Sequence, residues 1–353
     1  MSKYQEFDFN GLKKYRVEER KSKFAIDSMV KRKDCLMSNF IDSLPNINKS
    51  KDFKEFIELT FLAYRKKKPI LIGMGGHVIK TGMSPLIIDM MNLGLIQGIC
   101  CNGSVVIHDF EISCFGSTSE DVALALEEGS FGMASDTCDA INQIILQASN
   151  EKLGYGEAIG KYLAETSIPY PEYSILRNAY ELNIPITVHI ALGTDIAHQH
   201  ETAEGKAIGD CSLRDFRIFT NLVSQLGDGG VFINFGSAVI IPEVFLKALT
   251  VCRNKANNNL KKNQRTEDSF QESNYVFNSS TTELTDFVYN KINTRIEHFT
   301  TAVFDMQYHY RPLENIVNRP VQKNGQGFYF IGHHEIMIPL FFHCLREKCR
   351  DYK

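Results

Sequence analysis

The sequence predicts an α/β fold, a doubly wound, mostly parallel Rossmann-like sheet with an N-terminal helical extension and a helical insertion. Short apolar runs that end in glycine alternate with helical stretches, which is the pattern of repeated strand–helix–strand units. The apolar runs do not alternate with polar residues, so the strands should be buried on both faces. A chain of 353 residues with 43% hydrophobic and 23% charged residues can also supply a sizeable core.

The first strand–helix–strand unit lies between residues 69 and 101. Pro69 to Gly73 is an apolar run that ends in glycine, and Ser84 followed by Pro85 marks the start of a helix. Gly94 ends that helix, and the segment 95–101 reads as the next strand. Parallel pairing of the two strands is the strong expectation for such a unit.

The same pattern continues to the end of the chain. The predicted elements after the first unit are a helix over 173–182, a strand over 185–190, a helix over 216–226, a strand over 231–235, a helix from Pro242, strands over 301–307 and 328–331, and a helix over 336–345.

Three segments do not fit the repeating pattern. Residues 1–64 are charged and weakly periodic, and we expect an N-terminal helical extension there. Residues 65–350 then form the main domain, with a helical insertion at about 117–166. A mobile polar loop is expected at about 253–280, because this stretch has few apolar residues.

Composition excludes several classes of protein. The net charge of −3 and the lack of a long basic stripe argue against nucleic acid as a main partner. No apolar run reaches the roughly 18 residues of a membrane span, and the N-terminus lacks the apolar core of a signal peptide. Nine cysteines without framework spacing fit reduced thiols. We therefore expect a cytoplasmic protein that binds neither nucleic acid nor membrane.

Histidines and carboxylates concentrate just after the predicted strands, where ligands bind in open parallel sheets. Each histidine alone could be an ordinary core or loop residue, but eight of the ten fall at this one edge. They could act as acids and bases or bind a metal; no HExxH helix or CxxC pair supports a metal, and we assign none. The candidate catalytic residues are His108, Asp109, His198, His200, Glu243 and His334. We expect the carboxylates to act as bases or ammonium anchors, and the histidines to shuttle protons.

Glycine-rich turns follow three of the predicted strands. They are Gly73-Met74-Gly75-Gly76, Cys101-Asn102-Gly103-Ser104 and Phe235-Gly236-Ser237. A tight turn that needs positive φ would explain any one of them. Together, at one edge of the sheet, they favour a nucleotide whose phosphates approach the backbone.

These motifs resemble the deoxyhypusine synthase family. The segments that carry the resemblance are Gly76 to Gly82, Cys101 to Val105, Ile184 to Asp195, Phe235 to Val239 and Phe330 to Leu340. The resemblance covers most of residues 65–345 and implies an NAD-binding catalytic domain in a homotetramer. The residues that it implies for the cofactor are Gly76, Thr81, Asn102, Gly103, Asp195, Gly236, Ser237 and His333.

The chain departs from the family where the family transfers an aminobutyl group from the polyamine spermidine through a lysine. The Gly-Ser-Asp-Ser-Gly substrate loop is absent, the sequence has no Trp, and Lys323 lies a few residues out of register. We therefore expect an NAD-dependent enzyme that acts on a small amine or amino-acid-like substrate without the lysine relay. The alternatives are an authentic aminobutyl transferase that uses Lys323, a metal-dependent hydrolase that uses the histidines, and a non-catalytic nucleotide-binding protein.

Overall fold

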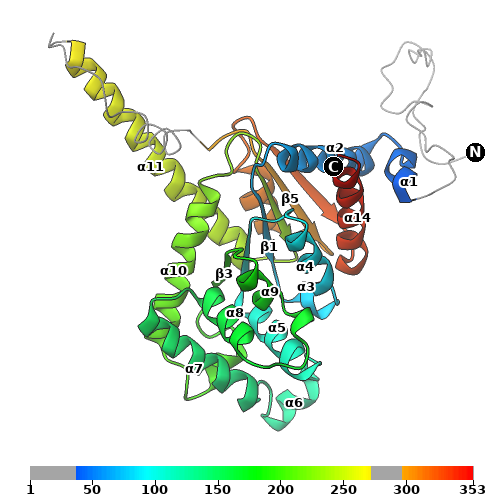
Figure 1. Cartoon of the computed structure of the whole chain (residues 1–353), viewed down its shortest axis with the longest axis vertical. Helices are drawn as coiled ribbons and strands as arrows, with labels where there is room; N and C mark the ends of the chain where they lie inside the picture. Colours follow the sequence, from blue (N-terminus) through cyan, green and yellow to red (C-terminus); the bar gives the residue numbers. More distant parts are fainter. Residues whose placement is uncertain (1–36, 272–295, 353) are drawn as a thin grey trace, which may run out of the picture. The chain divides into compact units, whose positions relative to one another are not determined.

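The computed structural model describes residues 37–271 and 296–352, and its centre is a sheet of six parallel strands (Figure 1). The compact unit that contains the sheet begins at Phe53. The strands are β1 (Ile70–Met74), β2 (Gly98–Asn102), β3 (Ile186–His189), β4 (Val231–Phe235), β5 (Thr300–Asp305) and β6 (Gln326–Ile331).

The strand order is β3-β2-β1-β4-β5-β6, and every neighbouring pair is parallel. The chain therefore builds outward from β1 in one direction and then from β4 in the other. The direction changes between β1 and β4, where Met74 pairs with Phe235. Ligands bind at this switch point in doubly wound sheets. The predicted fold class is confirmed.

The helices that follow these strands cover both faces of the sheet. They are α3 (His77–Lys80), α4 (Ser84–Asn92), α5 (Gly103–Phe115), α9 (Ile175–Glu181), α10 (Gly205–Val223), α11 (Ile240–Gln271), α13 (Tyr310–Pro312) and α14 (His334–Tyr352). Short helical turns are η3 (Pro171–Tyr173), η4 (Ile196–Gln199) and the π-helical η5 (Leu313–Asn318).

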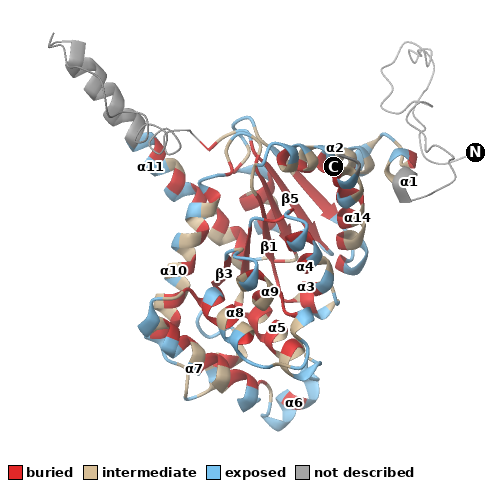
Figure 2. Ribbon diagram, in the orientation of Figure 1, coloured by how far each residue is buried: buried red, intermediate tan, exposed pale blue. Residues whose placement is uncertain are grey.

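Aromatic side chains fill the core on each face of the sheet. On one face the Phe232 ring stacks on Phe245 of α11, with ring centroids 4.1 Å apart, and Phe219 of α10 packs beside them. On the other face Phe341 of α14 packs against Phe235 and Phe304. Figure 2 shows the strands as buried except at the ends of β6 and at the last residue of β2, which explains why their sequences lack polar alternation.

The N-terminal extension was expected to end at residue 64, but part of it belongs to the sheet-containing unit. Helices α1 (Met37–Ser43) and α2 (Asn48–Arg65) are described in this region. From Phe53 onward, α2 buries Phe56 among Phe304, Phe328, Phe330 and Phe341. The earlier part of the extension, residues 1–36, lies outside the described residues.

The helical insertion at about 117–166 holds α6 (Val122–Glu128), α7 (Ser135–Glu151) and α8 (Tyr155–Glu165). It lies below the sheet in Figure 1, on the side to which the strands lead. This placement puts the insertion beside the carboxyl edge of the sheet.

The prediction of a polar loop at about 253–280 is wrong for residues 253–271, because α11 continues as helix to Gln271. This segment lacks an apolar stripe, but Lys, Gln, Arg and Glu are good helix formers without one. Residues 272–280 lie outside the described residues.

None of the described helices is long and apolar enough to cross a membrane.

Candidate functional site

Glycines at the carboxyl edge of the sheet allow the segments that follow five of the strands, β1, β2, β3, β4 and β6, to approach one another closely. A side chain on Gly75 would meet the carbonyl oxygen of Gly236 at 2.7 Å, and one on Gly236 would meet the His334 ring at 2.3 Å. A side chain on Gly103 would meet the Asp195 carboxylate at 2.0 Å. We call Gly75–Gly76, Gly103 and Gly236 the glycine-turn row; it runs across the switch point between β1 and β4.

Two backbone N–H groups in the first glycine turn lack acceptors of their own. Gly75 N–H donates to Phe235 O, but the N–H groups of Gly76 and His77 have no acceptor within the described part of the chain. Helix α5 begins at Gly103, and no side chain caps its N-terminus. Free amide donors and an uncapped helix start are the groups that bind phosphate.

Asp195 reaches the row from the loop after β3. Burial raises the pKa of its carboxyl to about 6. His198 Nδ1 accepts the N–H groups of Gly193 and Asp195, so its own proton lies on Nε2, 4.0 Å from the Asp195 carboxylate. His198 therefore shapes the loop that presents Asp195.

Two histidines meet where α3 and α14 begin. His77 Nδ1 lies 3.0 Å from His334 Nδ1, and His334 Nε2 lies 3.3 Å from the Phe304 carbonyl oxygen. A carbonyl can only accept, so His334 Nε2 carries a proton and its Nδ1 accepts from His77. Burial lowers the pKa of His334, which favours the neutral ring. This tautomer leaves His77 Nε2 as an acceptor.

His108 lies on α5 beside the first glycine turn. Its Cδ2 atom would be 3.0 Å from a side chain on Gly76, and its Nδ1 lies 2.7 Å from Thr118 Oγ1. Thr118 Oγ1 donates in turn to Glu111. Burial, with a smaller contribution from Lys80, lowers the pKa of His108 to about 4. This histidine is therefore neutral at pH 7.

Two predicted catalytic residues are not brought to the row. Both Asp109 oxygens are directed to the start of α9, where they accept from Ser174 Oγ and from the N–H groups of Ile175 and Leu176. His200 is bonded to Asp139 and to the Gly132 carbonyl in the insertion. Both were expected near substrate because they follow strands. The structure instead uses them to fasten helices and loops.

Glu243 lies in the first turn of α11, near the carboxyl edge but already paired. It accepts from Asn315 and forms ion pairs with Lys247 and Arg311. These partners lower the pKa of its carboxyl, the Lys247 hydrogen bond most. An ionised carboxylate with three partners is a poor general base.

The remaining predicted cofactor residues differ in how close they come to the row. Asn102 Oδ1 accepts from Ser104 Oγ at the start of α5, and Ser237 Oγ accepts from Ile241 N–H at the start of α11. Thr81 ends α3, with its hydroxyl bonded to the His77 carbonyl. His333 is exposed and lies beside Glu335, so it can reach a ligand only at the rim.

Lys323 lies at the other edge of the sheet. It is exposed in the turn just before β6 begins at Gln326, whereas the glycine-turn row follows the strand ends. Among the residues that the structure describes, no group of three or more His, Cys, Asp or Glu side chains is arranged to hold a metal.

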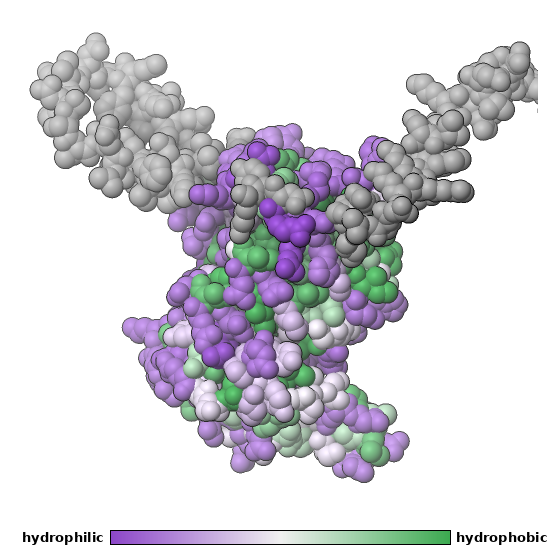
Figure 3. Space-filling model, turned by 45° about the vertical axis from the view of Figure 1, so that its right-hand side comes forward, coloured by the Kyte–Doolittle hydropathy of each residue, from purple (hydrophilic) through white to green (hydrophobic). Residues whose placement is uncertain are grey.

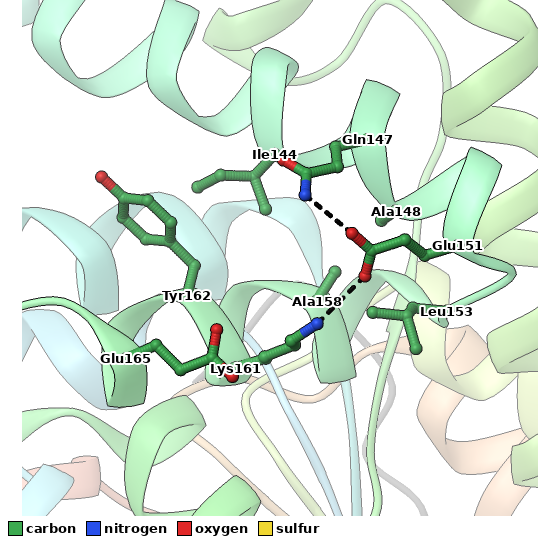
Figure 4. A pocket seen from close by; sticks show the side chains of 9 residues that line it. All are labelled: Ile144, Gln147, Ala148, Glu151, Leu153, Ala158, Lys161, Tyr162 and Glu165. Carbon is green, nitrogen blue, oxygen red and sulfur yellow. Dashed lines mark hydrogen bonds and ion pairs between the residues drawn. The ribbon is translucent and has the colours of Figure 1, made fainter.

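A pocket between α7 and α8 is separate from this edge (Figure 4). Glu151 there accepts from Gln147 and pairs with Lys161, so the charges of Glu151 and Lys161 offset each other. A larger pocket of about 380 Å³ lies nearer the row, where α3 ends and α5 passes. Its lining residues are Ile79, Gly82, Ser84, Pro85, Ile112, Gly116, Tyr170 and Tyr173.

Sequence reasoning did not select His77, Thr118 or Glu111 as site residues. His77 had a usable signal, since it comes directly after Gly75–Gly76. Thr118 and Glu111 had none, because they are joined to His108 only by the way the chain turns back after α5.

The sequence is similar to one curated protein of the deoxyhypusine synthase-like type. No family model matches the sequence. A curated "deoxyhypusine synthase-like protein" from Chlorobaculum parvum is 23% identical over 208 residues, which are 53% of this chain and 58% of that protein. The chain is a divergent relative of the deoxyhypusine synthase-like proteins. The match spans little more than half the length of this curated relative.

Solved structures are similar at a lower level. A provisionally assigned deoxyhypusine synthase from Entamoeba histolytica has a TM-score of 0.48 and 11% identity, over 88% of this chain and 95% of that chain. AgrE, solved with ornithine and NAD+, has a TM-score of 0.49 and 9% identity, over 85% of this chain and 33% of that chain.

Proposed function

We propose that this deoxyhypusine synthase-like chain binds NAD along the glycine-turn row and uses it on a small amine or amino-acid-like substrate. The observation that carries the proposal is the row itself, with the free N–H groups of Gly76 and His77 beside it. The likeness of the sequence to the deoxyhypusine synthase family makes NAD the first nucleotide to test.

The residues present fit a dinucleotide. The backbone donors at Gly76 and His77 and the uncapped start of α5 suit a pyrophosphate. The Asp195 carboxylate, across from Gly103, can accept a ribose hydroxyl or a substrate ammonium group. NAD, when bound, would supply a hydride acceptor.

The position of Lys323 supports a reaction without the lysine relay. An imine-forming lysine must lie near the cofactor, with a pKa lowered by its surroundings. Lys323 is exposed at the opposite edge of the sheet from the row. Aminobutyl transfer through Lys323 is therefore disfavoured, and no described metal cluster favours the hydrolase alternative.

Calorimetric titration with NAD tests the proposal. We expect saturable binding, weakened by about tenfold or more in Gly76→Ala, since the new methyl group would displace Ser104 and the His108 ring from the turn. Gly209→Ala is the matched control, because a side chain there meets nothing within 4 Å. Equal affinity in the parent and both variants, with all three folded, would refute the site.

A further inference from the structure

We propose that Glu111, Thr118 and His108 form a carboxylate–hydroxyl–imidazole relay that makes His108 Nε2 the proton acceptor for substrate in the crevice, by which we mean the space beside the glycine-turn row at the carboxyl edge of the sheet. His108 is the catalytic residue of this relay, and Thr118 and Glu111 are positioning residues. The inference rests on the proposed function only for the identity of the substrate that gives its proton to Nε2.

The hydrogen-bond directions in the relay are fixed by counting protons. Thr118 has one hydroxyl proton, and it goes to Glu111 because an ionised carboxylate can only accept. The contact of 2.7 Å between Thr118 Oγ1 and His108 Nδ1 must then use the proton on Nδ1. In a neutral ring this leaves Nε2 as a bare acceptor.

The edge of the ring next to Nε2 borders the first glycine turn. Cδ2, the ring carbon bonded to Nε2, would be 3.0 Å from a side chain built on Gly76. Within the described chain, Nε2 has no hydrogen-bond partner of its own. Ile112 follows His108 by one helical turn on the same face of α5 and lines the pocket of about 380 Å³. The pocket therefore adjoins the face of α5 that carries His108.

The proton transfer is simple. An O–H or N–H bond of the substrate breaks, its proton forms the Nε2–H bond, and the electron pair stays on the substrate atom. The resulting imidazolium donates through Nδ1 and Thr118 toward the Glu111 charge, which stabilises it. The second Glu111 oxygen accepts from Thr137 Oγ1 at 3.2 Å, so the carboxylate is held from both sides.

Burial lowers the pKa of His108 to about 4, so the ring without substrate is neutral at pH 7 and weakly basic. A ring that is neutral at pH 7 is ready to accept a proton, and contact with substrate can raise its pKa during the reaction. The pair His77–His334 is the weaker candidate, since its relay ends on the Phe304 carbonyl and carries no negative charge to offset an imidazolium.

Carbethoxylation with diethyl pyrocarbonate, which attacks unprotonated imidazole, tests the relay in the full chain without a known substrate. Peptide mass spectrometry would follow His108, with exposed His333 as an internal reference. We expect the His108 rate to stay flat from about pH 5 to 8, whereas an ordinary histidine slows as pH falls below about 6.5.

Substitutions of Thr118 and Glu111 test whether these residues position His108 or only support the fold. Thr118→Val and Glu111→Gln should slow His108 modification by about fivefold or more and leave His333 unchanged, because nucleophilicity follows basicity. Thr118→Ser, which keeps the hydroxyl, should restore the rate. Thr250→Val is the matched control, since that hydroxyl bonds only a carbonyl of its own helix.

The outcomes distinguish the relay from the cofactor proposal. Equal His108 rates in the parent, Thr118→Val and Glu111→Gln would overturn the relay, whatever NAD does. Saturating NAD should protect His108 by tenfold or so. If the variants slow His108 modification but NAD does not protect His108, the relay is supported and NAD binding at the glycine-turn row is contradicted.

Discussion

Asp109 and Asp215 are carboxylates buried far from water, and each holds the start of a helix. Asp109 holds α9, as described above. Asp215, on α10, accepts the N–H groups of Gly156 at the start of α8 and of Val188 in β3. Its other oxygen has no partner within the described residues. Helices α8 and α9 pack against each other, so the two carboxylates fasten one helix pair.

Stability should fall with rising pH because of Asp215. Burial raises its pKa to about 7 in the folded chain, against about 3.9 for an unfolded Asp. The folded state thus binds the proton more tightly, and this stabilisation is lost as pH rises through about 7. Between pH 5 and 8 the loss amounts to about 2 to 3 kcal/mol.

Urea denaturation of Asp215→Asn would measure this contribution. The variant lacks the titration, so the parent's advantage over it should be about 2 to 3 kcal/mol larger at pH 5 than at pH 8. Asp210→Asn on the same helix is the control, because Asp210 pairs with Arg214 at the surface. A parent–variant difference that is the same at both pH values would contradict the prediction.

At the scale of single elements, α2 is part of the core. Phe56 is fully buried among four rings from β5, β6 and α14. Its ring covers the β5–β6 side of the sheet, which would otherwise expose aromatic surface.

Phe56→Ala should destabilise the protein by about 3 to 5 kcal/mol, because it removes a buried ring and leaves a cavity. Leu62→Ala on the same helix should cost less than about 1 kcal/mol, since Leu62 is 37% exposed. Denaturant midpoints of both variants would check this. Comparable losses would mean that α2 contributes through helix propensity alone.

The sequence predicts the strands well, but it does not predict which helices pack against the sheet or how far they extend. All six strands were predicted, because buried apolar runs bounded by Gly or Pro are local signals. α2 was assigned to an extension because its apolar residues recur in a weakly periodic, charged stretch. The extension of α11 was missed because helix formers without an apolar face resemble a loop.

The sequence predicts the site only where suitable residues come directly after a strand. Glycine turns after strands predicted the row, since parallel strand ends must meet at one edge. Whether a carboxylate such as Asp109 faces the crevice or a helix depends on α9, which lies some 65 residues later. Nothing local in the sequence encodes that choice.

At the scale of the whole molecule, the insertion exposes apolar side chains. On α6, Val122, Leu124 and Leu126 are 46%, 57% and 66% exposed. Figure 3 shows apolar surface among polar surface at the lower end of the molecule, where Figure 1 places α6. Exposed apolar clusters mark interaction sites. The homotetramer that the sequence resemblance implies would need such a surface, and it stays a prediction.

Light scattering at micromolar concentration should give about four times the 40.1 kDa chain mass. Leu124→Glu with Leu126→Glu should lower the mass, since buried charges oppose association. Leu213→Glu is the control, being an equally exposed leucine on α10. A mass of 40.1 kDa for the parent would reject the assembly.

The change of direction between β1 and β4 divides the sheet into two halves that are synthesised one after the other. Strands β1 to β3 come from the first part of the described chain and β4 to β6 from the rest, with the Gly227–Gly230 turn between them. Gly75 meets Gly236, and His77 meets His334, only across this division. On the ribosome, a nascent chain that has emerged only as far as the turn contains β1 to β3 at most, so the contacts with Gly236 and His334 cannot yet form. Two polypeptides split at Gly229 should likewise regain the crevice only after they associate.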